Sequence, residues 1–194
     1  FPTDWEEADR IQEFHFMLKH ILGGNYSAQL SNIIKPGSQI LDIGCGPGHW
    51  CFEIAQEFPD ADIYGIDITP SFPSKIKPKN CYFQKCDILE GLPFGDNRFD
   101  YVFMRYMLPV MKKDQWPAVL KDIKRVMKPG GIIESVELNA TPYSMGPIYM
   151  KFNEKVAETM LKSFGMDLHM KFEPLFKEME FQNVMCTNKY ISIG

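Results

Sequence analysis

The chain has 194 residues, of which 45% are hydrophobic and 24% charged, and its formal net charge at pH 7 is −4. This length suits one domain with a substantial core, and no run of lysine and arginine marks a nucleic-acid surface. No apolar stretch approaches the roughly 20 residues of a membrane span and no charged-then-apolar leader is visible. We therefore expect a cytoplasmic or nuclear protein with no membrane or nucleic-acid partner.

The five cysteines are odd in number and form no C-x-x-C pair. This spacing supports neither a disulfide framework nor a zinc site, and no other cluster has the spacing of metal ligands. We therefore expect reduced cysteines that mostly pack in the core, and no metal.

The first predicted element is a helix that Thr3 or Asp4 caps and that Gly23-Gly24 ends. Its apolar stripe is Ile11, Phe14, Leu18 and Ile21. Because this helix precedes the first strand, we expect it to cover the ligand end of the sheet. The alternative is a plain packing helix whose charges are solvated.

Residues 39–50 read Q-I-L-D-I-G-C-G-P-G-H-W and organise the rest of the chain. The apolar residues around Asp42 predict a buried parallel strand. Gly44, Gly46 and Gly48 allow a sharp turn and a close approach of a ligand to the backbone. The pattern that follows is helical, so the unit is a strand, a glycine turn and a helix, with the ligand over the turn.

The type of ligand follows from the spacing of the glycines. A dinucleotide fingerprint is G-x-G-x-x-G and delivers a pyrophosphate to a helix N-terminus, whereas this turn is G-x-G-x-G, with Cys45 between the first two glycines. Asp42 would repel a phosphate but suits the ammonium and sulfonium charges of S-adenosylmethionine. The alternatives are an ordinary glycine-rich turn in another doubly wound domain and a nicotinamide dehydrogenase.

Acids follow the next two predicted strands. Asp67 ends the strand of residues 62–66 and lies 19 residues after Gly48, where nucleotide folds place the carboxylate that binds a ribose diol. Asp87 follows the strand of residues 81–85 and suits the adenine amino group, with Ile68 and Ile88 beside the nucleoside. The alternative for either acid is a turn or helix cap.

The fourth predicted strand, residues 99–104, is followed by Arg105 and Tyr106, which should face the substrate side. The sequence M-R-Y-M here differs from the N/D-P-P-Y/F tetrad of enzymes that methylate nucleobase or amide nitrogens, which argues against that chemistry. A helix from Asp114 and a fifth strand, residues 132–138, come next.

The last third of the chain predicts a long helix from Ser144 or Pro147 to Gly165, a helix after Pro174, and a sixth strand over residues 184–193. We expect the apolar side chains of the long helix to face inward, and Met145, Tyr149 and Met150 either to contact an apolar acceptor or to belong to the core. The inward-facing set is Ile148, Tyr149, Phe152, Val156 and Met160.

The order F-P-T-D-W-E-E-A-D-R, L-G-G-N, L-D-I-G-C-G-P-G-H-W, F-D-Y-V-F-M-R, K-P-G-G, G-M-D-L and E-F-Q-N-V resembles the fungal LaeA-like branch of the class I methyltransferases over essentially the whole chain. The resemblance implies an α/β, Rossmann-like, doubly wound and mostly parallel sheet. It also implies one methyltransferase domain, residues 1–194, with cover helices in 1–35, the cofactor-binding core in 36–139, and substrate-cover helices and strand six in 140–194.

Two departures from the family pattern stand out. Glu180 occupies a helix end where the family commonly has glycine. The seventh strand of the superfamily is missing from these residues, so either the sequence is a portion of a longer chain or the sheet closes differently.

The resemblance implies a methyltransferase associated with secondary metabolism. We expect methyl transfer from S-adenosylmethionine to an unidentified, small-molecule acceptor by in-line displacement, leaving S-adenosylhomocysteine. The alternative is a regulator or scaffold that binds the cofactor without turnover and acts through a protein partner. A base is needed only for acceptors such as hydroxyls, and His15, His20, Glu134 and Glu137 are candidates by location. The expected cofactor-binding set is Arg10, Asp42, Gly44, Cys45, Gly46, Gly48, Asp67, Ile68, Asp87, Ile88 and Arg105, with Arg10 or His15 available to the methionine carboxylate.

Overall fold

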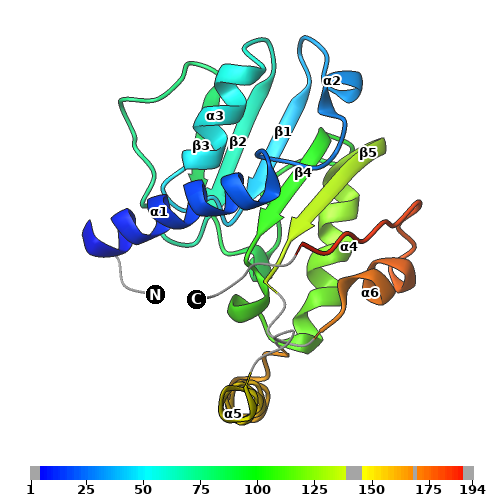
Figure 1. Ribbon diagram of the computed structural model, residues 1–194. Coiled ribbons are helices and arrows are strands. Elements are labelled where there is room, and N and C mark those ends of the chain that lie inside the picture. The colour runs from blue at the N-terminus through cyan, green and yellow to red at the C-terminus, as the bar shows by residue number, and fades with distance from the viewer. Residues whose placement is uncertain (1–4, 139–145, 168–169, 190–194) are drawn as a thin grey trace.

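A computed structural model describes residues 5–138, 146–167 and 170–189 (Figure 1). Its centre is a parallel sheet in the order β3-β2-β1-β4-β5. The reversal of strand order beside β1 makes the sheet doubly wound, as predicted. The strands are β1 (Gln39–Ile43), β2 (Asp62–Asp67), β3 (Cys81–Lys85), β4 (Phe99–Arg105) and β5 (Met127–Val136).

The helices lie on both faces of this sheet and beyond its carboxyl ends (Figure 1). Short 3-10 turns follow β3 and β4. The helices are α1 (Trp5–Leu22), α2 (Leu30–Ile33), α3 (His49–Glu57), α4 (Trp116–Val126), α5 (Pro147–Phe164) and α6 (Phe172–Glu178), and the turns are η1 (Ile88–Glu90), η2 (Leu108–Val110) and η3 (Lys113–Gln115).

The two faces of the sheet have separate cores because side chains alternate along each strand. Leu41 and Val102 face one core, which α4 and α6 complete. Ile40 and Phe103 face the other, which α3 completes. The central strands β1 and β4 are buried on both sides, which explains why their sequences are nearly continuous apolar runs.

The N-terminal segment packs on the α3 side of the sheet. Leu18 and His15 of α1 are buried, and α1 crosses near the carboxyl ends of the strands in Figure 1. Trp50 of α3 donates from Nε1 to the carbonyl oxygen of Asn25 at 2.8 Å and stacks on Phe103 at a ring-centroid distance of 4.2 Å. The segment after α1 is therefore fixed to the central core.

The sixth strand is not formed in the part of its range that the structure describes. Residues 184–189 have no regular structure, and residues 190–194 lie outside the described ranges. Only Val184 packs against a core, whereas Met185 is 91% exposed and polar residues follow it. The prediction failed because a β-like composition does not provide a strand with a hydrogen-bonding partner.

The inward-facing stripe of α5 was also predicted wrongly. Ala157 is the only buried residue of the helix, while Ile148 is 85% and Phe152 65% exposed. Figure 1 shows α5 lying apart from the sheet, beyond its carboxyl ends. Helical periodicity identified the helix and its end at Gly165, but not what its apolar face contacts. Met145 lies outside the described residues.

Glu180, at the helix end singled out in the sequence, adopts a left-handed conformation. Its φ is +59°, and the amide of Phe181 donates to the carbonyl oxygen of Phe176 at 3.0 Å. The ring of Phe181 packs on that of Phe176, which supplies the hydrophobic contact typical of this helix ending. A strained glutamate therefore closes α6 without a glycine.

Candidate functional site

The glycine turn after β1 has the sharp backbone predicted from sequence. Gly44, Gly46 and Gly48 have φ values of +74°, +52° and +87°. The amides of Gly44 and Cys45 donate to the carbonyl oxygen of Ile66 in β2 at 2.9 and 3.0 Å. A Cβ at Gly46 would have one neighbour within 4 Å, Cγ2 of Ile11 in α1 at 3.9 Å. The turn, called the cradle below, is therefore open at Gly46 beneath α1, whereas a Cβ at Gly44 or Gly48 would lie 2.7 Å from the side chain of Met107 or Phe83.

Asp67 holds this cradle in place. Its Oδ2 accepts from the amide of Gly46 and its Oδ1 from the amide of Thr69, both at 2.8 Å. Asp67 is thus a turn cap, yet each carboxylate oxygen has a second lone pair that can accept from a ribose hydroxyl. The structural and the ligand-binding roles of Asp67 are compatible.

Asp42 is a buried carboxyl group beneath the turn, 3% exposed. Its Oδ2 accepts from the thiol of Cys51 at 3.2 Å. Burial raises the pKa of Asp42 to about 7, although the Cys51 hydrogen bond and the nearby charge of Arg105 act in the opposite direction. A cation at the turn would favour the ionised form of Asp42.

Arg105 joins the cradle from the end of β4. Ile43 pairs with Met104, so Arg105 is level with Gly44 and on the same face of the sheet as Asp42. Its Nη2 lies 3.1 Å from Nδ1 of His15 in α1. His15, which is 1% exposed, lies 3.0 Å from Oε2 of Glu53 through Nε2. Side chains of α1, β4 and α3 therefore meet at this end of the sheet.

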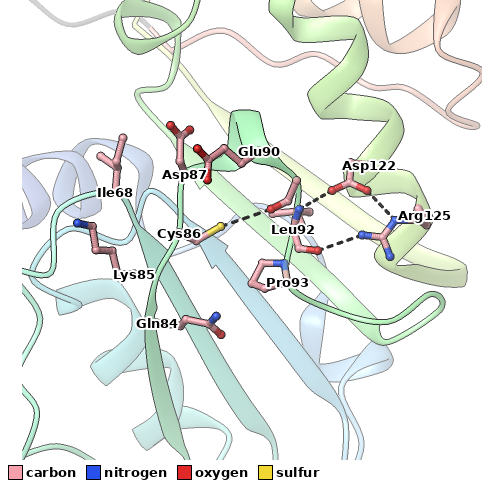
Figure 2. Close-up of a pocket in the computed structure, with 11 residues that line it drawn as sticks. Ile68, Gln84, Lys85, Cys86, Asp87, Glu90, Leu92, Pro93, Asp122 and Arg125 are labelled. Carbon is pink, nitrogen blue, oxygen red and sulfur yellow. Dashed lines mark hydrogen bonds and ion pairs between the residues drawn. The ribbon is translucent and has the colours of Figure 1, made fainter.

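Two of the residues expected around adenine, Ile68 and Asp87, border a separate cleft of about 740 Å³. Figure 2 shows Ile68 and Asp87 at one side of it and Asp122 and Arg125 of α4 at the other. Asp87 caps η1 by accepting from the amide of Leu89 at 2.9 Å. Neither the glycine turn nor Ile88 lines this cleft, and Ile88 is instead partly buried against a core. The cleft thus lies beyond the ends of β2 and β3, where Ile68 and Asp87 line it.

Arg10 does not join the cradle, contrary to the sequence-based expectation. Both its Nε and its Nη2 donate to the carboxylate of Glu7 at 2.7 Å, and its side chain is 54% exposed. The three-residue spacing on α1 places these two side chains next to each other. His15, one turn after Ile11 on the same face of α1, instead reaches Arg105 at the end of β4.

Glu134, a base candidate, anchors the N-terminal segment. Its carboxylate accepts from the amides of Ser27 at 2.8 Å and Ala28 at 3.1 Å, and from the hydroxyl of Tyr101 at 2.9 Å. These bonds join the segment between α1 and α2 to β5 and β4. A carboxylate used in this way is a structural acceptor rather than a free base.

We expect Glu134→Gln to lower the free energy of unfolding by about 1–3 kcal/mol, because the amide has one neutral acceptor oxygen where the carboxylate has two that share its charge, and its NH2 group would face the backbone amide of Ser27. Chemical denaturation measures the loss. The affinity for S-adenosylhomocysteine should stay within about twofold of the original. A variant of normal stability that lost methyl transfer would contradict the structural role and return Glu134 to the catalytic candidates.

Glu137 lies just beyond β5 and holds the turn after β4. Its oxygens accept from the amides of Met107 at 2.8 Å and Leu108 at 3.1 Å. Burial raises the pKa of Glu137 to about 7, opposed by these two hydrogen bonds. The turn it holds includes Tyr106, whose φ is +59°. His20, the remaining base candidate, is exposed near the end of α1.

Sequence reasoning missed two residues of this end of the sheet. Glu53 is an acid on α3 that no motif marks, and Met107 places its sulfur where a Cβ at Gly44 would be only 2.7 Å away. Both contacts join elements far apart in the sequence. The described residues contain no helix long and apolar enough to cross a bilayer, and no group of three or more His, Cys, Asp or Glu side chains that could hold a metal.

The fold and the cradle define the class of protein. A parallel sheet in this order, with a glycine turn after β1 and acids after β2 and β3, is that of a class I S-adenosylmethionine-dependent methyltransferase. Residues 40–131 match the family described as "Methyltransferase domain". A Haemonchus contortus phosphoethanolamine N-methyltransferase 2, solved with S-adenosylhomocysteine, is 22% identical with a TM-score of 0.58, covering 87% of this chain and 41% of that one.

Within this class, the chain belongs to the LaeA-like branch. It is 32% identical over 140 residues to the "Secondary metabolism regulator laeA" of Coprinopsis cinerea, covering 70% of this chain and 34% of that protein. It is 30% identical over 143 residues to the "Protein-methionine methyltransferase laeA" of Emericella nidulans, covering 73% and 37%. The chain thus spans about a third of the length of these relatives. The cofactor of the family is S-adenosylmethionine.

Proposed function

We propose that this chain transfers a methyl group from S-adenosylmethionine to an acceptor by in-line displacement. The observation that carries the proposal is the hydrogen bond from the amide of Gly46 to Asp67, which fixes the open position of the cradle beside a carboxylate that can accept further hydrogen bonds. S-adenosylmethionine supplies a methyl group on a positively charged sulfur. The protein's part is to hold the two partners in line and exclude water, an effect worth roughly 7–11 kcal/mol in favourable cases.

The proposed roles of the cradle residues follow from their chemistry. Asp67 accepts from the ribose hydroxyls, while Asp42 favours the cationic end of the cofactor. Gly46 lets the cofactor lie against the backbone, and Gly44, Cys45 and Gly48 shape the turn on either side of it. Asp87, with Ile68 and Ile88 nearby, forms the adenine end.

The proposed type of acceptor follows from the hydrogen bonds that the base candidates already make. Glu134 and Glu137 accept from backbone amides, and His15 lies between Arg105 and Glu53. This arrangement suits an acceptor atom that needs no deprotonation, such as a thioether sulfur, whose lone pair forms the new bond as the donor sulfur leaves. The name of the Emericella nidulans relative agrees with a methionine acceptor. A small-molecule acceptor, as expected from sequence, is the alternative.

The test is methyl transfer from isotopically labelled S-adenosylmethionine to methionine peptides and to a panel of small thioethers, amines and phenols. We expect label on the thioethers. Label only on the phenols or amines would contradict an acceptor that needs no base. Tight binding of S-adenosylhomocysteine without any methyl transfer would favour a second function, that of a cofactor-binding regulator. The regulator names of the relatives motivate this second candidate.

We expect Asp67→Ala to weaken S-adenosylhomocysteine binding by about 1.5–3 kcal/mol, because hydrogen bonds to a charged acceptor are lost and the Gly46 amide is released. Isothermal titration calorimetry measures the change. Asp60→Ala, which removes an exposed acid before β2, is the matched control and should bind normally. An unchanged affinity for Asp67→Ala would remove this residue from the ribose site.

A further inference from the structure

His15 connects α1 to the end of the sheet through two hydrogen bonds. Nδ1 of His15 lies 3.1 Å from Nη2 of Arg105, and Nε2 lies 3.0 Å from Oε2 of Glu53. Lys19, on the same helix, donates to the other oxygen of Glu53 at 2.6 Å. Glu53 is therefore held from α1 at two points, and Arg105 at one.

The chemistry of the partners fixes the tautomer of His15. A guanidinium has only donors, so Nδ1 must accept from Arg105. The proton then lies on Nε2, which donates to Glu53. Burial and the charge of Arg105 lower the pKa of His15, against the opposing effect of Glu53, and His49 beside it also lowers this pKa. The neutral ring is thus the form that holds Arg105.

Arg105 has capacity for an anionic ligand. His15 is its one side-chain hydrogen-bond partner among the described residues, and a guanidinium offers five N–H groups. Arg105 is level with Gly44 and on the same face as Asp42, so it lies at the cradle. A guanidinium matches the planar geometry of a carboxylate, and the expected cofactor carries one carboxylate, on its amino-acid end.

We propose that His15 is a positioning residue that orients the Arg105 guanidinium toward the carboxylate of the cofactor. This inference rests on the proposed function. In this role His15 does not contact the cofactor. It is therefore neither a direct ligand of the carboxylate nor a base, which are the two roles considered from sequence. Glu53 fixes the ring from behind, and α1 thereby takes part in recognising the amino-acid end of the cofactor.

The test compares two ligands that share the adenosine and thioether groups. S-adenosylhomocysteine has the amino-acid end and 5′-methylthioadenosine lacks it. We expect His15→Phe, which keeps a ring but has no polar atom, to weaken S-adenosylhomocysteine binding about tenfold and to leave 5′-methylthioadenosine within about twofold. His15→Gln, whose amide both accepts and donates, should restore much of the loss.

A matched control separates orientation of Arg105 from docking of α1. Lys19→Met removes the other α1 contact to Glu53 and leaves the His15–Arg105 bond, so both affinities should stay within about twofold. Equal losses of both ligands in His15→Phe would show that the histidine only docks the helix, and an unchanged S-adenosylhomocysteine affinity would also overturn the proposal.

Arg105→Gln is the second variant, and it keeps the inference testable if His15→Phe does not fold by circular dichroism. We expect it to lose S-adenosylhomocysteine affinity more than His15→Phe does and to spare 5′-methylthioadenosine. Equal losses for the two ligands, or no loss, would overturn the role of Arg105. If the unaltered chain binds neither ligand, the proposed function itself fails, which is a different result from any of these.

Discussion

Gly46→Val is expected to abolish detectable binding of S-adenosylmethionine and S-adenosylhomocysteine while the chain still folds. A Cβ at this position would meet only Ile11, at 3.9 Å, so the free protein has room for it. The added methyl groups would instead fill the space that we assign to the cofactor. Because φ is +52°, a left-handed valine also costs about 1–3 kcal/mol of stability. Calorimetry measures the binding, and chemical denaturation the stability.

Gly37 provides the matched control for this backbone cost. Its φ is +83°, and a Cβ added there would meet no atom within 4 Å. It lies before β1, at the opposite end of that strand from the cradle. Gly37→Val should lose similar stability and keep full affinity. If the two valine variants bound the cofactor equally well, the glycine turn would not be the binding site.

Asp42→Asn should stabilise the free protein at pH 8 and weaken its cofactor binding. The folded-state pKa of Asp42 is raised to about 7 from an ordinary value of 3.8. Between these values the folded protein keeps a proton that the unfolded chain has lost, so this residue makes stability fall as pH rises from about 4 to about 7. Above pH 7 Asp42 is ionised in the folded protein, and burying this charge costs stability. Asparagine carries no charge, so Asp42→Asn should raise the free energy of unfolding by about 2–4 kcal/mol at these pH values.

Thermal or chemical denaturation at pH 4, 6 and 8 measures this effect. The gain of Asp42→Asn should be near zero at pH 4 and largest at pH 8, while calorimetry at pH 8 should show S-adenosylhomocysteine binding weakened about tenfold or more. Asp60→Asn, at an exposed site, removes the same charge without removing a burial cost. A stability gain independent of pH would contradict the assigned cause.

The sequence predicted the sheet and its glycine turn because both are local patterns. Buried parallel strands are nearly continuous apolar runs, and three glycines at alternate positions are typical of a sharp turn whose residues need positive φ. The acids after β2 and β3 were located for the same reason. Whether Asp67 or Asp87 contacts a cofactor remains a prediction, as do the other assigned site roles.

The failures concern contacts between distant segments. The stripe of α5 has the period of a buried helix, yet periodicity does not say whether another element lies against it. The His15–Arg105–Glu53 contacts bring together α1, β4 and α3, and no spacing in the sequence indicates them. Glu134 was made a base candidate by its location on the strand alone, whereas the two backbone amides that it accepts from lie more than a hundred residues earlier.

Trp50 gives this arrangement an optical consequence. Its indole is 2% exposed, stacked on Phe103 and bonded to Asn25, the residue that follows the double glycine after α1. The emission of this fluorophore therefore depends on whether the segment leading from α1 remains seated against the sheet. In a variant that keeps Trp50 and replaces Trp5 and Trp116, this emission would report, without an added label, on the contact between that segment and the sheet.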